Sequence, residues 1–242
     1  MPISPDKERR SRILDAASER FVRFGYDKTT VADIARAARI SKGAFYLAFP
    51  SKDELFERLL LREMHRFSEA WFAQVQAHPR GGTLGPMYEA MLVALEGSPF
   101  VAMIFRRDRE LLGRYLAKPD NFFNDYATGQ PTRAEAIAAM QAVGAVRADV
   151  DPVVVAHIMN LLSHGLFASD PMAAHGPTPP IEDSIRGVAD MLDRAFTPAG
   201  GGNAEAGMQL LTKFFEGGRE AFERIQRERF PDPEDDENER AS

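Results

Sequence analysis

The residues of this sequence whose types and spacing could do chemistry are hydroxyl and amino side chains near the N-terminus. They are Thr29, Thr30, Lys42, Tyr46 and Lys52. Hydroxyl and ammonium groups donate hydrogen bonds to phosphate oxygens, and backbone N–H groups at helix N-termini favour the same anions. These residues therefore indicate binding to a polyanion such as DNA rather than catalysis.

Small and apolar residues lie among these hydrogen-bond donors. Gly43 and Ala44 would let a helix come close to DNA, and Leu47 could contact the methyl group of a thymine. The full set of candidate DNA contacts is Thr29, Thr30, Lys42, Gly43, Ala44, Tyr46, Leu47 and Lys52.

The charge of the chain is unevenly distributed. The 242 residues carry a net charge of −6, yet residues 1–50 contain ten basic and six acidic side chains. A basic end on an acidic body is typical of a protein that touches a polyanion at one end. The chain has no cysteine, which excludes disulfides and thiolate metal sites. No apolar run reaches the roughly 20 residues of a membrane span, and no signal-peptide pattern is present, so we expect a cytoplasmic protein with no membrane partner.

Three helices are predicted to position the candidate contacts. Apolar residues at helical spacing predict a first helix that Gly25 ends. Thr30 and Ser41 are suited to be the N-caps of two short helices, which residues 38–41 connect. These dimensions are typical of a helix-turn-helix, whose second helix enters the major groove of DNA. A long helix is predicted to follow from Lys52.

The rest of the chain also shows helical periodicity. Helices are predicted for residues 83–97, 99–117, 120–128, 132–144, 151–168 and 182–196, and a further amphipathic stretch follows residue 202. The predicted fold is all-α, with an N-terminal three-helix helix-turn-helix domain joined by a long helix to a larger C-terminal helical domain. We divide the chain into a DNA-binding domain (1–50), the larger domain (51–230) and an acidic tail (231–242) with the composition of a disordered segment.

Residues 13–60, and above all 25–56, resemble the N-terminal signature of TetR-type (tetracycline-repressor-like) transcriptional regulators. The matching positions are Gly25, Tyr26, Thr29, Thr30, Ile34, Ala35, Ser41, Lys42, Gly43, Phe45, Tyr46, Phe49, Ser51, Lys52 and Leu55. The resemblance implies a homodimer that binds a partly palindromic, double-stranded DNA operator, by default as a repressor. It also implies that the C-terminal domain dimerises and binds a small-molecule effector that releases the DNA. A transcriptional activator of the same fold is the alternative.

Two positions depart from the family pattern. Arg39 stands where such proteins usually have a glycine, in a turn whose φ is often positive and costs a residue with a Cβ about 1 kcal/mol. Ala48 stands where an aromatic or histidine side chain often contacts a phosphate. We therefore expect a strained or altered turn and one missing phosphate contact.

Bulky, flexible side chains are concentrated in the C-terminal part of the chain, and the resemblance implies that some of them line a largely apolar effector pocket. The candidates are Phe67, Trp71, Met87, Met91, Met103, Phe105, Phe122 and Tyr126. For any single one of these residues, an ordinary place in the core is the alternative.

The predicted helices 151–168 and 182–196 have more apolar surface than one neighbour would cover, and the resemblance implies dimerisation through this pair. The candidate interface residues are Val154, Ile158, Leu161, Leu162, Ile185, Val188 and Leu192. Burial within one subunit is the alternative. His157 and His164 lie about two helical turns apart, too far to hold one metal ion without further ligands, which favours an interface or core role for both.

The sequence contains no nucleophile elbow, phosphate-binding loop or metal-ligand spacing. We therefore expect no catalytic residue, no metal and no cofactor. Two other classes of function stay open. One is an all-α enzyme whose basic end is incidental. The other is an architectural protein that binds DNA without sequence preference, which the acidic body of the chain disfavours.

Overall fold

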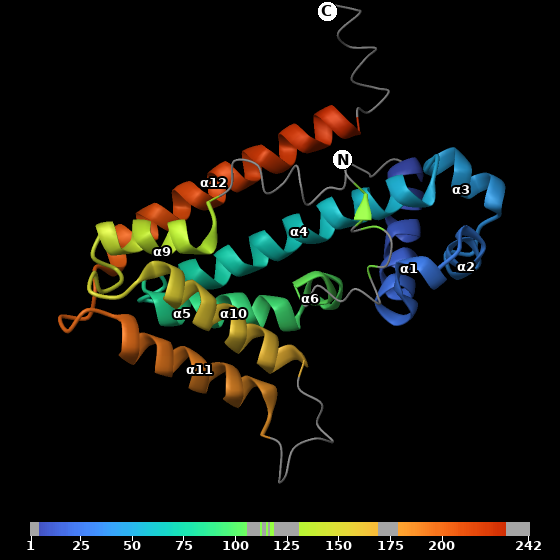
Figure 1. Ribbon diagram of the computed structural model, residues 1–242. Helices are drawn as coiled ribbons and strands as arrows, with labels where there is room; N and C mark the ends of the chain where they lie inside the picture. The colour runs from blue at the N-terminus through green and yellow to red at the C-terminus, as the bar shows by residue number, and fades with distance from the viewer. Residues whose placement is uncertain are drawn as a thin grey trace, which may run out of the picture. The chain divides into compact units, whose positions relative to one another are not determined.

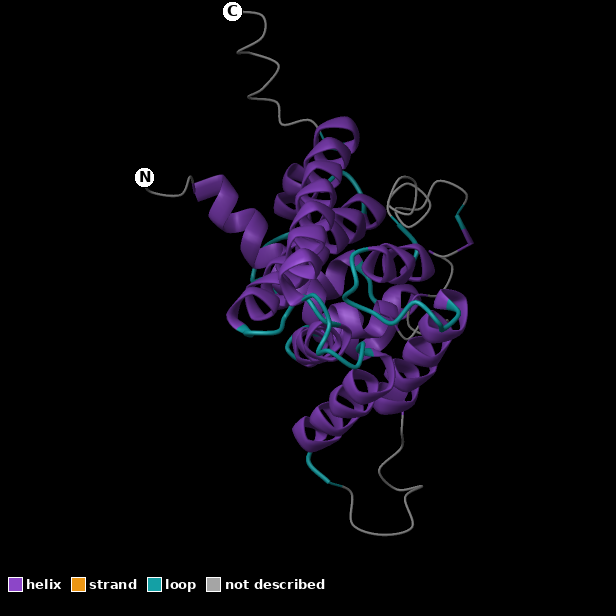
Figure 2. Ribbon diagram, turned by 90° about the vertical axis from the view of Figure 1, so that its left-hand side faces the viewer, coloured by secondary structure: helices purple, strands orange, loops and turns teal. Residues whose placement is uncertain are grey.

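The structure is a computed structural model that describes residues 5–105, 112, 115, 117, 118, 131–168 and 179–230. The regular elements in this part of the chain are α-helices, apart from 3₁₀ conformation at residues 115 and 117, and Figure 2 shows no strand among the described residues. The predicted all-α fold is confirmed. The predicted helix 120–128 and the acidic tail 231–242 lie outside the described residues.

The helices are labelled in Figure 1. In chain order they are α1 (Pro5–Lys28), α2 (Val31–Ala37), α3 (Lys42–Ala48), α4 (Lys52–Ala77), α5 (Leu84–Glu96), α6 (Pro99–Phe105), α9 (Arg133–Ala142), α10 (Pro152–Ala168), α11 (Ile181–Phe196) and α12 (Ala204–Arg229). The helices predicted for 83–97, 132–144, 151–168 and 182–196 agree with α5, α9, α10 and α11 to within two residues. The amphipathic stretch after residue 202 forms one continuous helix, α12.

The chain forms two compact units. The first unit consists of residues 1–65, 99–126 and 222–242, and the second of residues 66–98 and 127–221. The helices α4 and α12 each contribute residues to both units. The helix-turn-helix therefore shares one compact unit with segments from the middle and the end of the chain.

The core of the first unit is rich in aromatic rings, with Phe56 of α4 at its centre. The Phe56 ring lies 5.0 Å from Phe21, 4.9 Å from Tyr26, 4.6 Å from Tyr115 and 5.7 Å from Phe100, measured between ring centroids. Edge-to-face pairs of this kind add about 0.5–1.5 kcal/mol to the stabilisation from burial. Rings from three other segments thus pack on Phe56 and fix the helix-turn-helix on α4.

The C-terminal end of α12 belongs to the same core. Phe222 and Phe230 are buried in the cluster that contains the aromatic rings of α1 and α4. The guanidinium of Arg229 pairs with the carboxylate of Glu57 at 2.8 Å, and the Arg58 guanidinium lies 4.7 Å from the centroid of the Phe230 ring. The last turns of α12 are therefore a structural part of the unit that contains the helix-turn-helix.

In the second unit, the connection between α4 and α5 packs backbone to backbone against α12. A Cβ on Gly82 would lie 2.0 Å from the carbonyl oxygen of Ala204, and a Cβ on Gly207 would lie 2.0 Å from that of Gly82. Such distances are far below van der Waals contact, so both positions require glycine. Farther along, the rings of Phe72 and Phe215 stack at 4.2 Å and extend this packing of α4 on α12.

Within the described ranges, no single helix is both long and apolar enough to cross a membrane. The helices α5 and α6 meet those criteria only when they are taken together across the break between them.

Candidate DNA-binding surface

The first helix is interrupted where the sequence predicted its end. Gly25 has φ 77° and ψ 170°, a conformation that residues with a Cβ rarely adopt. The backbone break directs residues 26–30 towards the start of α2. The hydroxyl of Thr29, which is 2% exposed, donates a hydrogen bond of 2.7 Å to the Gly25 carbonyl oxygen and holds this bend.

A capping box begins α2, the first helix of the helix-turn-helix. The Thr30 hydroxyl accepts from the backbone N–H of Asp33, and the Asp33 carboxylate accepts from the backbone N–H of Thr30. Hydrogen bonds from the Thr30 hydroxyl and backbone N–H lower the pKa of Asp33, so the carboxylate stays ionised at the helix N-terminus. This reciprocal cap fixes where α2 starts.

The turn between α2 and α3 contains the strained residue that the sequence predicted. Arg39 has φ 57°, a positive value that no other non-glycine residue shows in the described part of the chain. The turn brings Ile40 back to the core, where its backbone N–H donates to the Ala35 carbonyl oxygen at 2.9 Å. The side chain of Arg39 is exposed. Arg39 is therefore an exposed basic group beside α3, although the sequence pattern indicated only strain in its backbone.

The helix α3 has one buried and one exposed face. Phe45 and Ala48 are buried against the core, and the Ser41 hydroxyl caps the helix by accepting from the backbone N–H of Ala44. On the other face, Tyr46 is 54% exposed and Leu47 is 80% exposed. Lys42 and Gly43 are also exposed, whereas Ala44 is half-buried. The burial of Ala48 gives a reason why no large polar side chain stands there.

Two of the predicted DNA contacts, Lys52 and Thr29, have structural roles within the protein. The Lys52 ammonium donates hydrogen bonds to the carbonyl oxygens of Tyr26 at 2.9 Å and Thr29 at 3.1 Å, and it lies 4.1 Å from the centroid of the Tyr26 ring. Because these contacts join the start of α4 to the α1–α2 connection, the half-buried Lys52 supports the helix-turn-helix. The side chain of Thr29 is buried for the same purpose. The Thr29 side chain is thus too buried to bind a phosphate, which corrects that prediction, whereas a phosphate contact of Lys52 stays a prediction.

Gly43 offers a test that separates packing from DNA contact. A Cβ built on Gly43 would meet nothing closer than the Ser41 hydroxyl oxygen at 3.8 Å, so the protein itself does not require glycine there. We expect Gly43→Ala to leave thermal stability unchanged or raise it by up to about 1 kcal/mol, because alanine is the better helix former. We expect operator affinity to fall roughly tenfold or more, because the added methyl group fills space at the DNA surface.

Thermal unfolding and a DNA-binding titration of the same preparations measure the two effects. Ser41→Ala is a useful comparison because it removes the N-cap and should lower stability by about 1 kcal/mol. Full operator affinity in Gly43→Ala would mean that the α3 backbone does not approach DNA at this residue.

The candidates for the effector pocket do not form one group. Trp71 and Met87 pack together in the second unit, where the indole N–H of Trp71 donates to the Met87 carbonyl oxygen at 3.3 Å. Phe67 is buried on α4. Met103 is 1% exposed inside the core of the first unit, so its predicted role in the pocket is corrected to that of a core residue.

The remaining pocket candidates differ in accessibility. The side chain of Met91 is half-buried on α5, and that of Phe105 is 39% exposed at the end of α6. Phe122 and Tyr126 lie outside the described residues. The part of the predicted pocket that the structure brings together is therefore the α4–α5 cluster around Trp71 and Met87.

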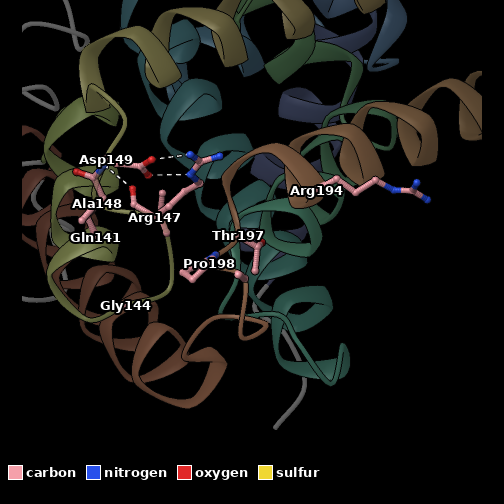
Figure 3. A pocket seen from close by; sticks show the side chains of 10 residues that line it. Gln141, Gly144, Arg147, Ala148, Asp149, Arg194, Thr197 and Pro198 are labelled. Atoms are coloured by element: carbon pink, nitrogen blue, oxygen red, sulfur yellow. Dashed lines mark hydrogen bonds and ion pairs between the residues drawn. The ribbon is translucent and has the colours of Figure 1, made fainter.

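A cavity of about 670 Å³ lies elsewhere in the second unit, between the segment after α9 and the end of α11 (Figure 3). Its lining residues include Gln141, Arg147, Asp149, Arg194 and Thr197. The Arg147 guanidinium is held by two hydrogen bonds to the Asp149 carboxylate, which raise the pKa of Arg147 and lower that of Asp149. Because this pair is already neutralised and no predicted pocket residue lines the cavity, it is distinct from the predicted effector site.

The helices α10 and α11 have several exposed apolar side chains. Val153 is 63% exposed, Val154 is 52% exposed and Leu161 is 59% exposed on α10, and Met191 is 49% exposed on α11. Ile158, Leu162 and Val188 are half-buried. Ile185 and Leu192 are each 1% exposed, so these two are corrected from interface residues to core residues of the protomer.

His157 and His164 both lie on the exposed side of α10, which excludes a core role within the protomer. No group of three or more His, Cys, Asp or Glu residues that could hold a metal ion occurs within the ranges the structure describes.

The known proteins that this chain resembles are bacterial transcriptional regulators. Residues 13–59 match the family described as bacterial regulatory proteins, tetR family. The chain is 28% identical over 187 residues to the HTH-type transcriptional repressor Rv1474c of Mycobacterium tuberculosis, an alignment that covers 74% of this chain and 93% of that protein. It is 33% identical over 103 residues to the uncharacterized HTH-type transcriptional regulator YuxN of Bacillus subtilis. That alignment covers 40% of this chain and 34% of YuxN. The chain thus spans about a third of the length of YuxN.

Among solved structures, the transcriptional regulator SCO4942 from Streptomyces coelicolor has the same fold, with a TM-score of 0.56 and 21% identity. That similarity covers 77% of this chain and 97% of SCO4942. The family match falls on residues that build α1, α2, α3 and the start of α4. Residues 13–59 therefore match the tetR family of bacterial regulatory proteins, and the relatives named above are transcriptional regulators rather than enzymes.

Proposed function

We propose that this chain is a cytoplasmic, ligand-responsive repressor that binds a partly palindromic DNA operator as a homodimer and is released from it by a small effector. The observation that carries this proposal is the exposed face of α3. Lys42, Gly43, Tyr46 and Leu47 are all accessible there, on a helix whose other face is fixed in the core. The TetR family and the repressor named among the relatives support the direction of control.

The homodimer is supported by the uncovered apolar residues of α10 and α11. A partly palindromic operator presents two equivalent half-sites, so it is matched by a protein with two-fold symmetry. An exposed apolar stripe on two neighbouring helices is the kind of surface that a second copy covers.

The effector site is proposed for the second unit, around Trp71 and Met87. Both side chains are half-buried rather than fully packed, and methionine adapts its shape to a ligand. The helix α4 carries Trp71 and also contributes Lys52 and Phe56 to the helix-turn-helix unit. A ligand that binds better to the arrangement that cannot bind DNA would lower operator affinity, and a coupling of 1–3 kcal/mol corresponds to about 5- to 150-fold release.

The function is tested first by a gel-shift titration of the DNA upstream of the gene and its neighbours. We expect one fragment to bind much more tightly than a scrambled duplex, and a reporter under its control to be repressed by the protein. Equal affinity for both duplexes would contradict a sequence-specific regulator, and increased reporter expression would indicate an activator.

Lys42→Ala should weaken operator binding through the loss of a phosphate contact. Because its ammonium group is exposed at the start of α3, we expect affinity to fall for all sequences alike. The slope of log K against log[salt] should become shallower by about 1 for each protomer, or about 2 for the dimer. Binding titrations at several salt concentrations measure this slope.

Lys213→Ala is the matched control, because Lys213 is an exposed lysine of α12 in the second unit. This variant should keep the wild-type slope. A Lys42→Ala protein that prefers different bases but retains the salt dependence would show that Lys42 reads bases rather than phosphates.

A further inference from the structure

A half-buried cation lies in the second unit at the start of α9. The Nη1 atom of Arg133 is itself buried and has no hydrogen-bond partner, and no carboxylate among the described residues forms an ion pair with this guanidinium. The other terminal nitrogen, Nη2, lies 3.6 Å from the sulfur of Met91 on α5. A thioether is a weak acceptor and does not compensate a buried positive charge.

Tyr88, which interacts electrostatically with Arg133, already has hydrogen-bond partners of its own. The buried hydroxyl of Tyr88 lies 2.7 Å from the Met159 carbonyl oxygen and 2.6 Å from the Ser163 hydroxyl, so it forms no hydrogen bond with Arg133. Burial raises the pKa of Tyr88, which keeps the phenol neutral. Burial also lowers the pKa of Arg133, as expected for a cation without a counter-ion.

An unpaired buried guanidinium destabilises a folded protein, and such groups are normally paired with a carboxylate. Nothing in the packing of α9 requires the charge, because Thr132 and Glu135 already form the capping box that begins this helix. The available donor of Arg133 is therefore suited to an acceptor that none of the described residues supplies.

The surroundings of Arg133 define what else such a ligand would contact. Met91 touches the guanidinium, and Met87 precedes Met91 by one helical turn on α5. The Met87 carbonyl oxygen accepts from the indole of Trp71, so contacts lead from Arg133 along α5 to the cluster proposed above as the effector site. One cation at the edge of apolar side chains fits a molecule with one anionic group and an apolar body.

We propose that this site binds apolar monocarboxylic acids, whose carboxylate pairs with Nη1 of Arg133 and whose hydrocarbon part packs on the methionines of α5. The inference rests on the proposed function, since it gives the chemical class of the effector. A carboxylate is favoured over a neutral acceptor because charge-assisted hydrogen bonds to arginine are about twice as strong as neutral ones.

The test compares octanoate and benzoate with octanamide and benzamide, which have the same shape without the charge. Binding is followed by the fluorescence of Trp71, the single tryptophan, and by the shift in Tm. We expect each acid to bind roughly tenfold or more tightly than its amide, and Arg133→Met to abolish that preference. Acids that bind no better than the amides, or a preference that persists in Arg133→Met, would overturn the proposal.

A second measurement needs no added ligand. Arg133→Met replaces the unpaired cation by an apolar side chain of similar length, so we expect Tm to rise by about 2–4 °C. Arg194→Met, at an exposed arginine that pairs with Asp190, should leave Tm within about 1 °C. A lower Tm for Arg133→Met would show that the charge is paired within the protein and would also overturn the proposal.

Operator binding by the ligand-free wild-type protein is measured separately. If this protein did not bind the operator, the proposed repressor function would be contradicted, but the preference for acids over amides would still stand.

Discussion

Replacing Leu161 with glutamate should convert the proposed dimer into monomers with little operator affinity. The Leu161 side chain is 59% exposed on α10, so the change leaves the fold of the protomer intact, but it would place a charge in the apolar surface that a second copy covers. Two linked half-sites bind more tightly than one by a factor of roughly 10² to 10⁴. We expect a loss of operator affinity of that order.

Sedimentation velocity gives the oligomeric state, and a gel-shift titration gives the affinity. Val93→Glu is the matched control, because Val93 is an apolar residue of α5 that is 36% exposed outside the proposed interface. This variant should stay dimeric and bind the operator. A Leu161→Glu protein that remains fully dimeric would place the interface on another surface.

Phe222→Ala should have the largest effect on stability. Phe222 is 4% exposed in the core of the unit that contains the helix-turn-helix, and its ring lies 5.9 Å from that of His65. Truncation of a buried phenylalanine costs about 3–5 kcal/mol. We expect this loss in the free energy of unfolding, measured in urea, together with weaker operator binding near the new Tm, because the damaged core is the one that positions α3.

Phe24→Ala makes the same chemical change in α1 at a side chain that is 39% exposed. Its cost should be less than about 1 kcal/mol, mainly from the contacts with Arg20 and Arg23. A free energy of unfolding that is unchanged in Phe222→Ala would mean that the end of α12 does not support the helix-turn-helix unit.

The sequence by itself determined most of the described helices and the resemblance of residues 13–59 to the tetR family. Caps such as Thr30 and Ser41, the break at Gly25 and the strained Arg39 were all predicted correctly, because each depends on residues within one or two turns of the chain. The helix-turn-helix was recognisable for the same reason. The exposure of Tyr46 and Leu47 also follows from helical periodicity, once Phe45 and Phe49 are placed in the core.

Only the tertiary structure decided which polar side chains form hydrogen bonds within the protein. Lys52 and Thr29 have the chemistry of phosphate ligands, but they serve carbonyl oxygens of the α1–α2 connection. The end of α12 joins the helix-turn-helix unit through contacts with residues more than a hundred positions away, as in the pair of Glu57 and Arg229. The burial of Arg133 depends likewise on α5, which lies far from it in the sequence. Burial and pairing between distant segments depend on packing, which no local pattern of residue types encodes.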